Sequence, residues 1–364
     1  MRGWSAAATD AARARRAGAR QGLRPLLGLA FAVLGACAQL PATERALRQP
    51  VNPVIDSDFP DPAVLRAADG WIYAFATQTT REDRLINIQV ARSRDLASWE
   101  YLGEALPEKP VWSGGTQNFW APDVVYDAET RRYVMYYSAE RDGSREFCLA
   151  VATAAAARGP YVDIGQPLLC GRGFEHIDPM AFDDPRSGRR MLYWGSGFGP
   201  IRVRELARDR LRFEQGSIAQ DLLLPGLERD YSRLVEGAWV TFRDGYYYLY
   251  YSGDNCCSGT PRYAVMVARA HSPFGPFTRL GEADGSGRSV ILEADGTWLA
   301  PGHNSVHTDA AGRDWMLYHA IDPRQPALVD QVHGRIARRV LLVEPLEYVD
   351  GWPRVARAAG AARP

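Results

Sequence analysis

The sequence has little lysine and no excess of either charge. Lys109 is the one lysine among 43 basic residues, and 43 acidic residues balance them to a formal net charge of zero. A protein that binds nucleic acid by neutralising phosphates usually carries a basic excess or patch, so we expect no nucleic-acid partner. No run of 18 or more apolar residues occurs, and no lasting transmembrane helix is therefore expected.

What the chain does have is the composition of a globular protein. Of its 364 residues, 46% are hydrophobic and 11% are aromatic. A chain of this length and composition can bury one large core or two modest ones. Intrinsic disorder over most of the length is therefore excluded.

The N-terminus reads as a targeting segment. Residues 1–24 are rich in arginine, and residues 25–36 form a mostly apolar stretch that is too short to span a bilayer. The stretch ends in Leu34-Gly35-Ala36-Cys37, which resembles a bacterial lipobox. We predict a signal peptide over 1–36, a tether over 37–50, and membrane contact through a lipid anchor at Cys37 alone. The alternative is an ordinary secretory signal, which would make the protein secreted or periplasmic; the chain is exported in either case.

Four further cysteines fit an exported protein. They are Cys148, Cys170 and the adjacent pair Cys256-Cys257, and in an oxidising compartment they allow two disulfides in three connectivities. A Cys148–Cys170 bridge requires that the two residues lie on neighbouring strands, and the alternative is buried free thiols. No C-x-x-C spacing and no adjacent basic partner supports a metal-binding or nucleophilic role.

The rest of the chain is an internal repeat of about 60 residues. Each copy has a polar turn, an aromatic-rich strand and a second strand with small residues, bounded by Gly, Pro and Asp. Units of this size that each supply one sheet are typical of propeller blades. We predict an all-β, five-bladed β-propeller as a single domain over 51–355, with a tail over 356–364; a β-sandwich fits worse. The anchors of the five copies are Tyr73, Met135, Tyr193, Leu249 and Tyr318.

One polar residue leads the first strand of each copy. In a propeller the first strands line the central channel, so these residues would form a ring around its axis, and crowded carboxylates there would have widely separated pKa values. Turn chemistry alone could explain an Asp-Pro leader. It does not explain Glu236, which sits between apolar neighbours where an unused charge is costly. The five leaders are Asp61, Asp123, Asp178, Glu236 and His303.

The motifs around these leaders resemble glycoside hydrolase family 43, which includes arabinanases, α-L-arabinofuranosidases and β-xylosidases on a five-bladed propeller. The resemblance covers roughly residues 50–355, with one motif in each repeat and all five in the family's order. Ala63 departs from it, because the family often has serine there. The motifs are Asp58-Phe59-Pro60-Asp61-Pro62, Phe119-Trp120-Ala121-Pro122-Asp123-Val124, His176-Ile177-Asp178-Pro179, Val235-Glu236-Gly237-Ala238-Trp239 and Pro301-Gly302-His303-Asn304-Ser305.

The resemblance implies a role for each leader. Asp61 would be the general base, Glu236 the general acid, and Asp178 the third carboxylate that tunes and orients the acid. His303 would help to hold a structural calcium or sodium ion, largely through water, and the chemistry itself would require no cofactor. Asp123 would support the site without carrying a proton. Asp58 is a competing candidate for the base, and we take it as a loop or substrate contact.

Several side chains near the ring are candidates for binding sugar. Aromatic residues beside the carboxylates offer flat apolar platforms, whereas for Trp239 packing between blades is the better explanation. His319 and His333 have no partner in the sequence and are taken as structural. The predicted substrate contacts are Phe59, Asn118, Trp120, Ser252 and, at a position where the family often has an arginine, Arg335.

The resulting hypothesis is an inverting glycoside hydrolase that acts on plant pentosans: arabinan, arabinoxylan side chains or xylo-oligosaccharides. The chain ends soon after the fifth repeat, without the extra β-sandwich of many β-xylosidases, which favours arabinan. One alternative is a catalytically silent carbohydrate-binding propeller. Another is a fructoside-cleaving relative, whose retaining carboxylates stand about 5–5.5 Å apart, compared with roughly 6.5–9.5 Å in an inverting pair. Oligomeric state, linkage and endo or exo action are open.

Substitution of the base and the acid tests this assignment. Asp61→Asn and Glu236→Gln should each reduce glycosidase turnover by about 10²–10⁴-fold or more, because each removes one of the two proton transfers. Circular dichroism should show an unchanged fold. Turnover at the wild-type rate in either variant would contradict the assignment.

Overall fold

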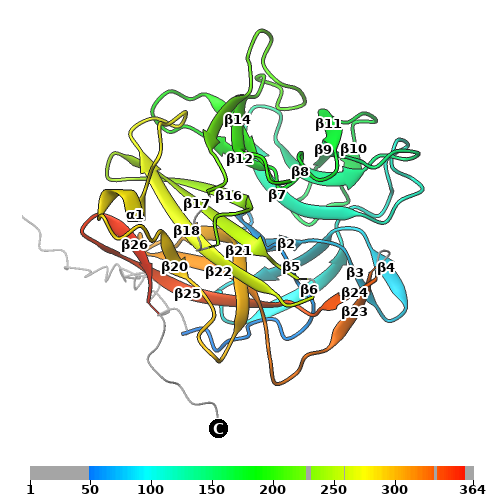
Figure 1. Ribbon diagram of the computed structural model, residues 1–364. Helices are drawn as coiled ribbons and strands as arrows, with labels where there is room; N and C mark the ends of the chain where they lie inside the picture. Colours follow the sequence, from blue (N-terminus) through cyan, green and yellow to red (C-terminus); the bar gives the residue numbers. More distant parts are fainter. Residues whose placement is uncertain (1–48, 227–230, 258, 332–333, 357–364) are drawn as a thin grey trace, which may run out of the picture. The chain divides into compact units, whose positions relative to one another are not determined.

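A computed structural model describes residues 49–226, 231–257, 259–331 and 334–356. Five antiparallel sheets follow one another along the chain from Ala63 to Val355 and form a five-bladed β-propeller in one domain, as predicted (Figure 1). The predicted signal peptide, Cys37 and most of the tether and tail lie outside the described residues. Within those residues, no helix is long and apolar enough to cross a membrane.

Each blade is built from one continuous stretch of chain. Blade 1 contains β1 (Ala63–Arg66), β2 (Ile72–Ala76), β5 (Gln89–Ser93) and β6 (Trp99–Glu104). Blade 2 contains β7 (Phe119–Asp127), β8 (Arg132–Glu140), β9 (Glu146–Ala154) and β10 (Val162–Asp163), with β11 (Leu169–Arg172) also pairing with β9. Blade 3 contains β12 (Met180–Asp183), β13 (Arg190–Trp194), β14 (Ile201–Glu205) and β15 (Gln220–Leu223).

Blades 4 and 5 follow the same plan. Blade 4 contains β16 (Val235–Arg243), β17 (Tyr246–Asn255), β18 (Arg262–Ala270) and β19 (Thr278–Arg279), followed by α1 (Leu280–Ala283) and by β20 (Val290–Leu292), which pairs with β18. Blade 5 contains β21 (Leu299–Thr308), β22 (Asp314–Ile321), β25 (Val340–Val349) and β26 (Trp352–Val355). Two hairpins are inserted between second and third strands: β3 (Thr79–Arg81) with β4 (Arg84–Ile86), and β23 (Leu328–Gln331) with β24 (Gly334–Ala337).

Apolar side chains on both faces of the second strands hold the blades together. On β17, Leu249 and Tyr251 pack in a cluster shared with blade 3, whereas Tyr248 and Tyr250 pack in a cluster shared with blade 5. This alternation follows from the two-residue repeat of a strand. Five such clusters, one between each pair of neighbouring blades, close the ring. Burial of each large side chain contributes about 1.5–3 kcal/mol.

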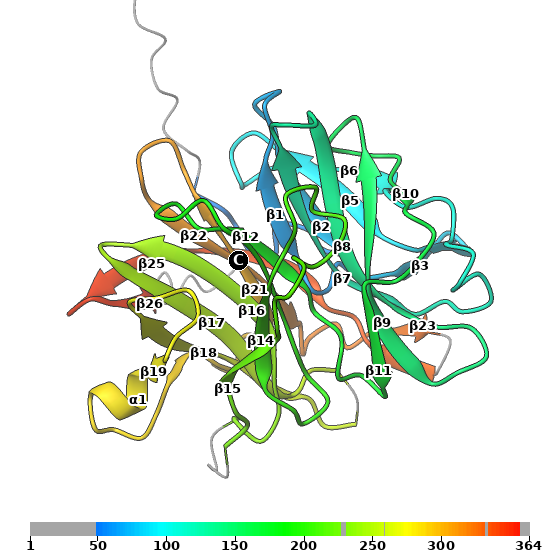
Figure 2. The same cartoon turned by 90° about the horizontal axis from the view of Figure 1, so that it is seen from above.

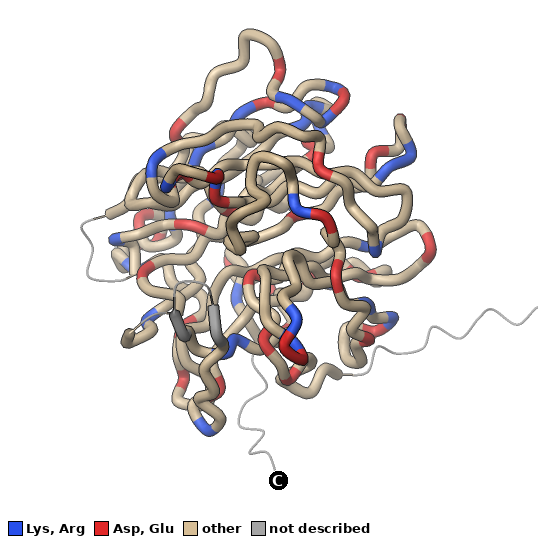
Figure 3. The backbone as a smooth tube through the Cα atoms, turned by 90° about the vertical axis from the view of Figure 1, so that its right-hand side faces the viewer, with Lys and Arg blue, Asp and Glu red and all other residues tan. Residues whose placement is uncertain are grey.

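The ring is also fastened at its ends. The amide of Val54 donates to the carbonyl of Leu341 at 2.9 Å, and Nδ2 of Asn52 donates to Glu344 Oε1 at 2.8 Å. The chain ahead of blade 1 is therefore attached to β25 of blade 5. The first strands β1, β7, β12, β16 and β21 each contact the first strands of both neighbours and gather near the centre of Figure 2. Basic and acidic positions are interspersed along the backbone in Figure 3.

One residue with left-handed backbone stands at the same place at the start of each blade. A non-glycine residue in this conformation is uncommon, and such residues gather at functional sites. In blades 2, 4 and 5 it lies within a shift of the strand register, as in a β-bulge. The five residues and their φ angles are Asp61 (55°), Ala121 (45°), Asp178 (59°), Gly237 (60°) and His303 (46°).

This finding corrects the predicted ring of leaders. Asp61, Asp178 and His303 do occupy equivalent positions, but Glu236 comes one residue before the left-handed Gly237 and Asp123 comes two residues after Ala121. The strand register pairs Glu236 with Ser252, as it pairs Trp120 with Ser138, so the structural counterpart of Glu236 in blade 2 is Trp120. The alignment of the five internal repeats was wrong at these two residues, because bulges shift the strand register by amounts that the residue pattern does not show.

Hydrogen bonds between neighbouring blades fix these left-handed residues. The amide of Ala121 donates to Thr77 Oγ1 at 2.8 Å, and the amide of Asp178 donates to Ser138 Oγ at 3.0 Å. These acceptors stand near, or just beyond, the end of the second strand in the preceding blade. The remaining two contacts of this type run from the amide of His303 to Ser252 Oγ at 2.8 Å and from the amide of Asp61 to His319 Nδ1 at 3.1 Å.

Removal of one acceptor should weaken the ring. Ser138→Ala would leave the buried amide of Asp178 without its partner, at a cost of about 1–3 kcal/mol in the free energy of unfolding. Urea unfolding would measure the loss. The control is Ser98→Ala, at an exposed position, which should leave stability unchanged. Equal stability of the two variants would show that the bond between blades 2 and 3 contributes nothing.

Candidate active site

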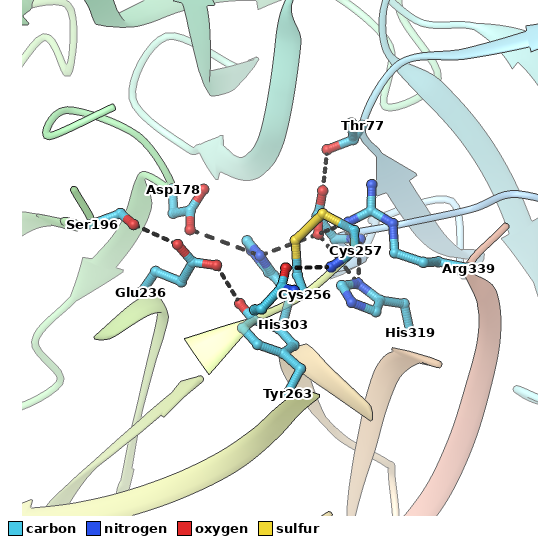
Figure 4. Close-up of a disulfide and its surroundings, with 12 residues drawn as sticks. Thr77, Asp178, Ser196, Glu236, Cys256, Cys257, Tyr263, His303, His319 and Arg339 are labelled. Atoms are coloured by element: carbon cyan, nitrogen blue, oxygen red, sulfur yellow. Dashed lines mark hydrogen bonds and ion pairs between the residues drawn. A yellow bond between two sulfur atoms is a disulfide. The ribbon is translucent and has the colours of Figure 1, made fainter. Parts of the chain in front are cut away.

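A cavity of about 660 Å³ opens where the first strands begin, and it collects the predicted carboxylates. Asp61, Asp178, Glu236 and His303 all line it. In Figure 4, Glu236 and Asp178 lie on one side of the site and Arg339 and His319 on the other, with His303 between them. These residues come from four different blades, so the cavity exists only when the ring is closed.

Asp61 is held as an ionised carboxylate. It is buried, and Thr77 Oγ1 donates to its Oδ2 at 2.6 Å while Arg339 Nη1 donates to its Oδ1 at 3.1 Å. Burial by itself would raise the pKa of Asp61. The positive charge of Arg339 instead holds that pKa well below its ordinary value. A carboxylate that stays ionised near neutral pH can accept a proton from water.

The pKa of Glu236 is shifted in the opposite direction to that of Asp61. Tyr263 donates its hydroxyl hydrogen to Oε1 at 2.7 Å, and Ser196 Oγ donates to Oε2. Burial raises the pKa of Glu236 and the charge of Asp61 adds to the rise, although the two hydroxyl groups lower it. The net direction is upward, as a proton donor requires.

Asp178 lies between the two and shares this environment. Its Oδ2 accepts a hydrogen bond from the amide of Gly237 at 3.0 Å, next to Glu236 in the chain. Burial, followed by the charges of Glu236 and Asp61, raises the pKa of Asp178 well above its ordinary value. Asp178 and Glu236 therefore retain a proton at a pH where Asp61 has lost its own.

Burial favours the neutral form of the two histidines, which serve as fixed polar groups. His303 Nδ1 lies 3.3 Å from Asp61 Oδ1 and 3.8 Å from Asp178 Oδ2, and burial lowers its pKa. His319 is fully buried, and burial lowers its pKa to about 4. Its Nδ1 can therefore accept the amide hydrogen of Asp61. The interpretation of His319 as a structural residue without a partner missed this contact with the base.

The surroundings of His303 offer few ligands for the predicted calcium or sodium ion. Among the described residues, no group of three or more His, Cys, Asp or Glu side chains is arranged to hold a metal ion. Nδ1 of His303 faces two carboxylates. An ion near His303 would need water for most of its ligands, and it stays a prediction.

Tyr263 connects the acid to the base. Its ring stacks on that of His319 with a centroid distance of 5.8 Å and an interplanar angle of 5°. The ring also lies flat against Gly302, where an added Cβ would stand 2.0 Å from a ring carbon. The glycine of the Pro301-Gly302-His303 motif therefore leaves room for the tyrosine that contacts Glu236.

The predicted substrate contacts divide into two groups. Asn118 and Trp120 line the cavity, and Trp120 is supported by a stacked Phe147 at 4.2 Å. Phe59 is fully buried in the cluster between blades 5 and 1, and Ser252 is fully buried as the acceptor for the amide of His303. Neither can reach a sugar in the cavity, so these two predictions are wrong. Phe59 is close to Asp61 in the sequence and Ser252 pairs with Glu236 across two strands, but both side chains point into the core of the propeller.

Other assignments are settled by packing. Trp239 packs among the clusters between blades, as expected. Asp123 is buried below the cavity, where its Oδ2 accepts the amide of Ala181 at 2.7 Å and burial raises its pKa to about 7. The carboxylate of Asp58 accepts hydrogen bonds from Thr79 Oγ1 at 2.8 Å and from the amide of Arg339 at 3.0 Å. The side chain of Arg335 and residue His333 lie outside what is described.

Arg339 is a charged site residue that the sequence analysis did not find. It lines the cavity and pairs with Asp61, which is 278 positions away in the chain. Asp58 positions it through its backbone amide. One local signal existed, because a buried arginine in Arg338-Arg339-Val340 is costly unless it is paired. Thr77 and Tyr263 were missed as well, since a hydroxyl carries no distinctive pattern.

Both disulfides that the four cysteines allow are present. Cys148 and Cys170 are joined across the neighbouring strands β9 and β11, where they are register partners. Cys256 is joined to Cys257 in the loop between β17 and β18. Both members of the second pair line the cavity.

Comparison with known proteins shows the family. Residues 50–353 match Glycosyl hydrolases family 43. The chain therefore belongs to this family and is a glycoside hydrolase, as the motifs predicted, and the fructoside-cleaving alternative is removed. A solved structure of a thermostable family-43 glycoside hydrolase is similar, with a TM-score of 0.68 and 25% identity, covering 87% of this chain and 98% of that one.

Three relatives show the range of activities at similar distance. Arabinan endo-1,5-alpha-L-arabinosidase C of Emericella nidulans is 29% identical over 80% of this chain and 89% of its own length. Extracellular endo-alpha-(1->5)-L-arabinanase 1 of Bacillus subtilis is 27% identical over 80% and 86%. Beta-D-galactofuranosidase of Aspergillus niger is 30% identical over 74% and 75%. The substrate of this chain does not follow from membership alone.

The acidic limb of the pH–rate profile tests the environment of Asp61. The base must be ionised, so activity rises as pH rises through the pKa of Asp61. Arg339→Gln removes the charge that lowers this pKa, and the acidic limb of kcat/KM should move to higher pH. The matched control is Arg338→Gln, which removes the neighbouring arginine that pairs with Asp56. Equal acidic limbs in both variants would exclude Arg339 from control of the base.

The alkaline limb tests the environment of Glu236. The acid must be protonated, so activity falls as pH rises through its pKa. Tyr263→Phe removes a hydroxyl that lowers this pKa, and the alkaline limb should therefore move to higher pH, with a lower kcat. The control is Tyr247→Phe, whose buried hydroxyl donates to Asp184 outside the cavity. A shift in both variants, or in neither, would contradict the contact.

Proposed function

We propose that this protein is an exported, inverting glycosidase that cleaves α-L-arabinofuranosyl linkages in arabinan. The observation that supports it best is a single cavity in which Asp61 is kept ionised while Glu236 and Asp178 keep a proton. Two carboxyl groups with separated pKa values are what glycoside hydrolysis requires. Arabinan is favoured because the relatives from Emericella nidulans and Bacillus subtilis are named as acting on it.

In the proposed reaction, Asp61 removes a proton from a water molecule whose oxygen bonds to the anomeric carbon. The bond from that carbon to the leaving oxygen breaks at the same time, and Glu236 gives its proton to the leaving oxygen. Water thus adds from the face opposite the leaving group, and the anomeric configuration is inverted. Asp178 holds the backbone beside Glu236, because its Oδ2 accepts the amide hydrogen of Gly237.

Each polar neighbour has a place in this scheme. Thr77 and Arg339 hold both oxygens of Asp61, and so they fix the direction in which the base faces the water. Ser196 and Tyr263 hold both oxygens of Glu236. Trp120 offers an apolar surface and Asn118 a polar one to the sugar.

Export rests on the N-terminal pattern and on the Bacillus subtilis relative, which is named as extracellular. A lipid anchor at Cys37 remains one form of this proposal. Metabolic labelling with a radioactive fatty acid would test it, because Cys37→Ser should abolish incorporation. Incorporation into that variant would exclude Cys37 as the anchor.

Hydrolysis assays test the substrate and the mechanism together. The exported protein should release sugar from linear 1,5-α-L-arabinan and from an aryl α-L-arabinofuranoside, and Glu236→Gln should release at least about 10²-fold less. Proton NMR should show the β-anomer of arabinose first. An aryl β-D-xyloside, an aryl β-D-galactofuranoside and xylo-oligosaccharides serve as comparison substrates.

Three results would contradict the proposal in different ways. Activity on the xyloside or the galactofuranoside alone would show that the substrate is not arabinan. An α-anomer as the first product would show retention. Failure to hydrolyse any substrate, with arabinan still bound, would favour a silent carbohydrate-binding propeller.

A further inference from the structure

The disulfide between Cys256 and Cys257 lies in the wall of the catalytic cavity. Its loop joins β17 to β18 in blade 4, the blade that also supplies Glu236. Both cysteines are half-buried and line the same cavity as Asp61 and Glu236. Figure 4 shows the sulfur atoms among the side chains of the site.

The loop is held by several contacts besides the S–S bond. Cys256 packs against an apolar cluster that contains Tyr263, Ala300 and Ile321. Across the loop, Asn255 Nδ2 donates to the carbonyl of Thr260 at 3.1 Å. At the base of the loop, Arg262 pairs with Asp254. These contacts position the loop without the S–S bond, so they leave the sulfur atoms facing the cavity without a structural explanation.

The chemistry of the cavity calls for an apolar surface at this place. A furanose ring presents hydroxyl groups at its edge and C–H groups on its face. Carboxylates, His303 and Arg339 can bind the hydroxyl groups. The C–H groups need apolar neighbours, and sulfur atoms are apolar and polarisable and form only weak hydrogen bonds.

We propose that the Cys256–Cys257 disulfide is a sugar-contacting wall that packs against the C–H face of the sugar ring at the cleavage site. This inference rests on the proposed function and names a further binding element of the same site. A wall of this kind contacts the sugar equally before and during bond cleavage, so it lowers KM and Kd and leaves kcat and the pH profile unchanged.

Two variants of equal shape separate an apolar wall from a covalent tie. Cys256→Val/Cys257→Val and Cys256→Thr/Cys257→Thr both lack the S–S bond, and they differ only in a methyl or a hydroxyl group at each position. Each is combined with Glu236→Gln, and the binding of arabinohexaose is measured by calorimetry. The valine pair should bind within about threefold of the Glu236→Gln parent, and the threonine pair about tenfold more weakly, the factor expected for losing the burial of one to two methylene-sized apolar groups.

The other disulfide supplies the matched control. Cys148→Ser/Cys170→Ser removes a disulfide from blade 2, outside the cavity, and should lower stability with no change in Kd. Equal affinity of the valine and threonine pairs, whether strong or weak, would overturn the proposal. Failure of the parent to bind arabinohexaose, with no hydrolysis by the wild type, would overturn the proposed function itself and the wall with it.

A protection experiment keeps the proposal testable if the variants fail to fold. The Glu236→Gln protein is treated with a phosphine reductant and iodoacetamide, with and without saturating arabinohexaose, and alkylation is followed by peptide mass mapping. The sugar should slow alkylation of Cys256 and Cys257 at least about fivefold, in proportion to the bound fraction, and leave Cys148 and Cys170 unaffected. Equal rates at Cys256 and Cys257 with and without the sugar would overturn the contact.

Discussion

The hydrogen bond from the left-handed amide of one blade to the second strand of the blade before it is the constraint on which the site depends. It joins Ala121 to Thr77, Asp178 to Ser138, His303 to Ser252 and Asp61 to His319. Three of these bonds are buried and the one from His303 is partly buried, and the loss of any of them would leave an amide unsatisfied. Because the donors are themselves Asp61, Asp178 and His303 in three of the five blades, the bonds that close the ring also aim the groups that carry the proposed chemistry.

The repeated contact changes at the two junctions between blades that hold the proposed acid and base. Between blades 3 and 4, Ser196 Oγ donates a hydrogen bond to the carboxylate of Glu236. The left-handed amide of Gly237 donates to Asp178 instead of to a side chain of the second strand. Between blades 5 and 1, an imidazole replaces the hydroxyl, and a buried His319 contacts Asp61. Blade 2 keeps the regular contact and has alanine at its left-handed position. Functional groups are expected where one copy of a repeat differs from the others, because the positions that stay the same in every copy stabilise the fold.

Charge in the cavity is arranged by burial and by one arginine. Three carboxyl groups at close quarters cannot all ionise in a buried site. The positive charge of Arg339 favours ionisation of Asp61, whereas burial raises the pKa values of both Asp178 and Glu236. Tyr263, which contacts Glu236 and stacks on His319, gives the acid and the base a common rigid neighbour. Cys256 of the disulfide packs against the cluster that contains the same tyrosine, and both cysteines line the cavity.

The sequence by itself determined the five repeats, the apolar alternation that stacks the blades, and the three carboxylates, because strand periodicity and short motifs are local properties of the chain. Only the tertiary structure decided that Arg339 pairs with Asp61, that Phe59 and Ser252 face the core, and that Glu236 is offset from the other leaders. The physical reason is ring closure. It brings residues together across as many as 278 positions, and bulges shift the register by single residues. No single segment of the sequence shows which distant residues will meet or which register two strands will adopt.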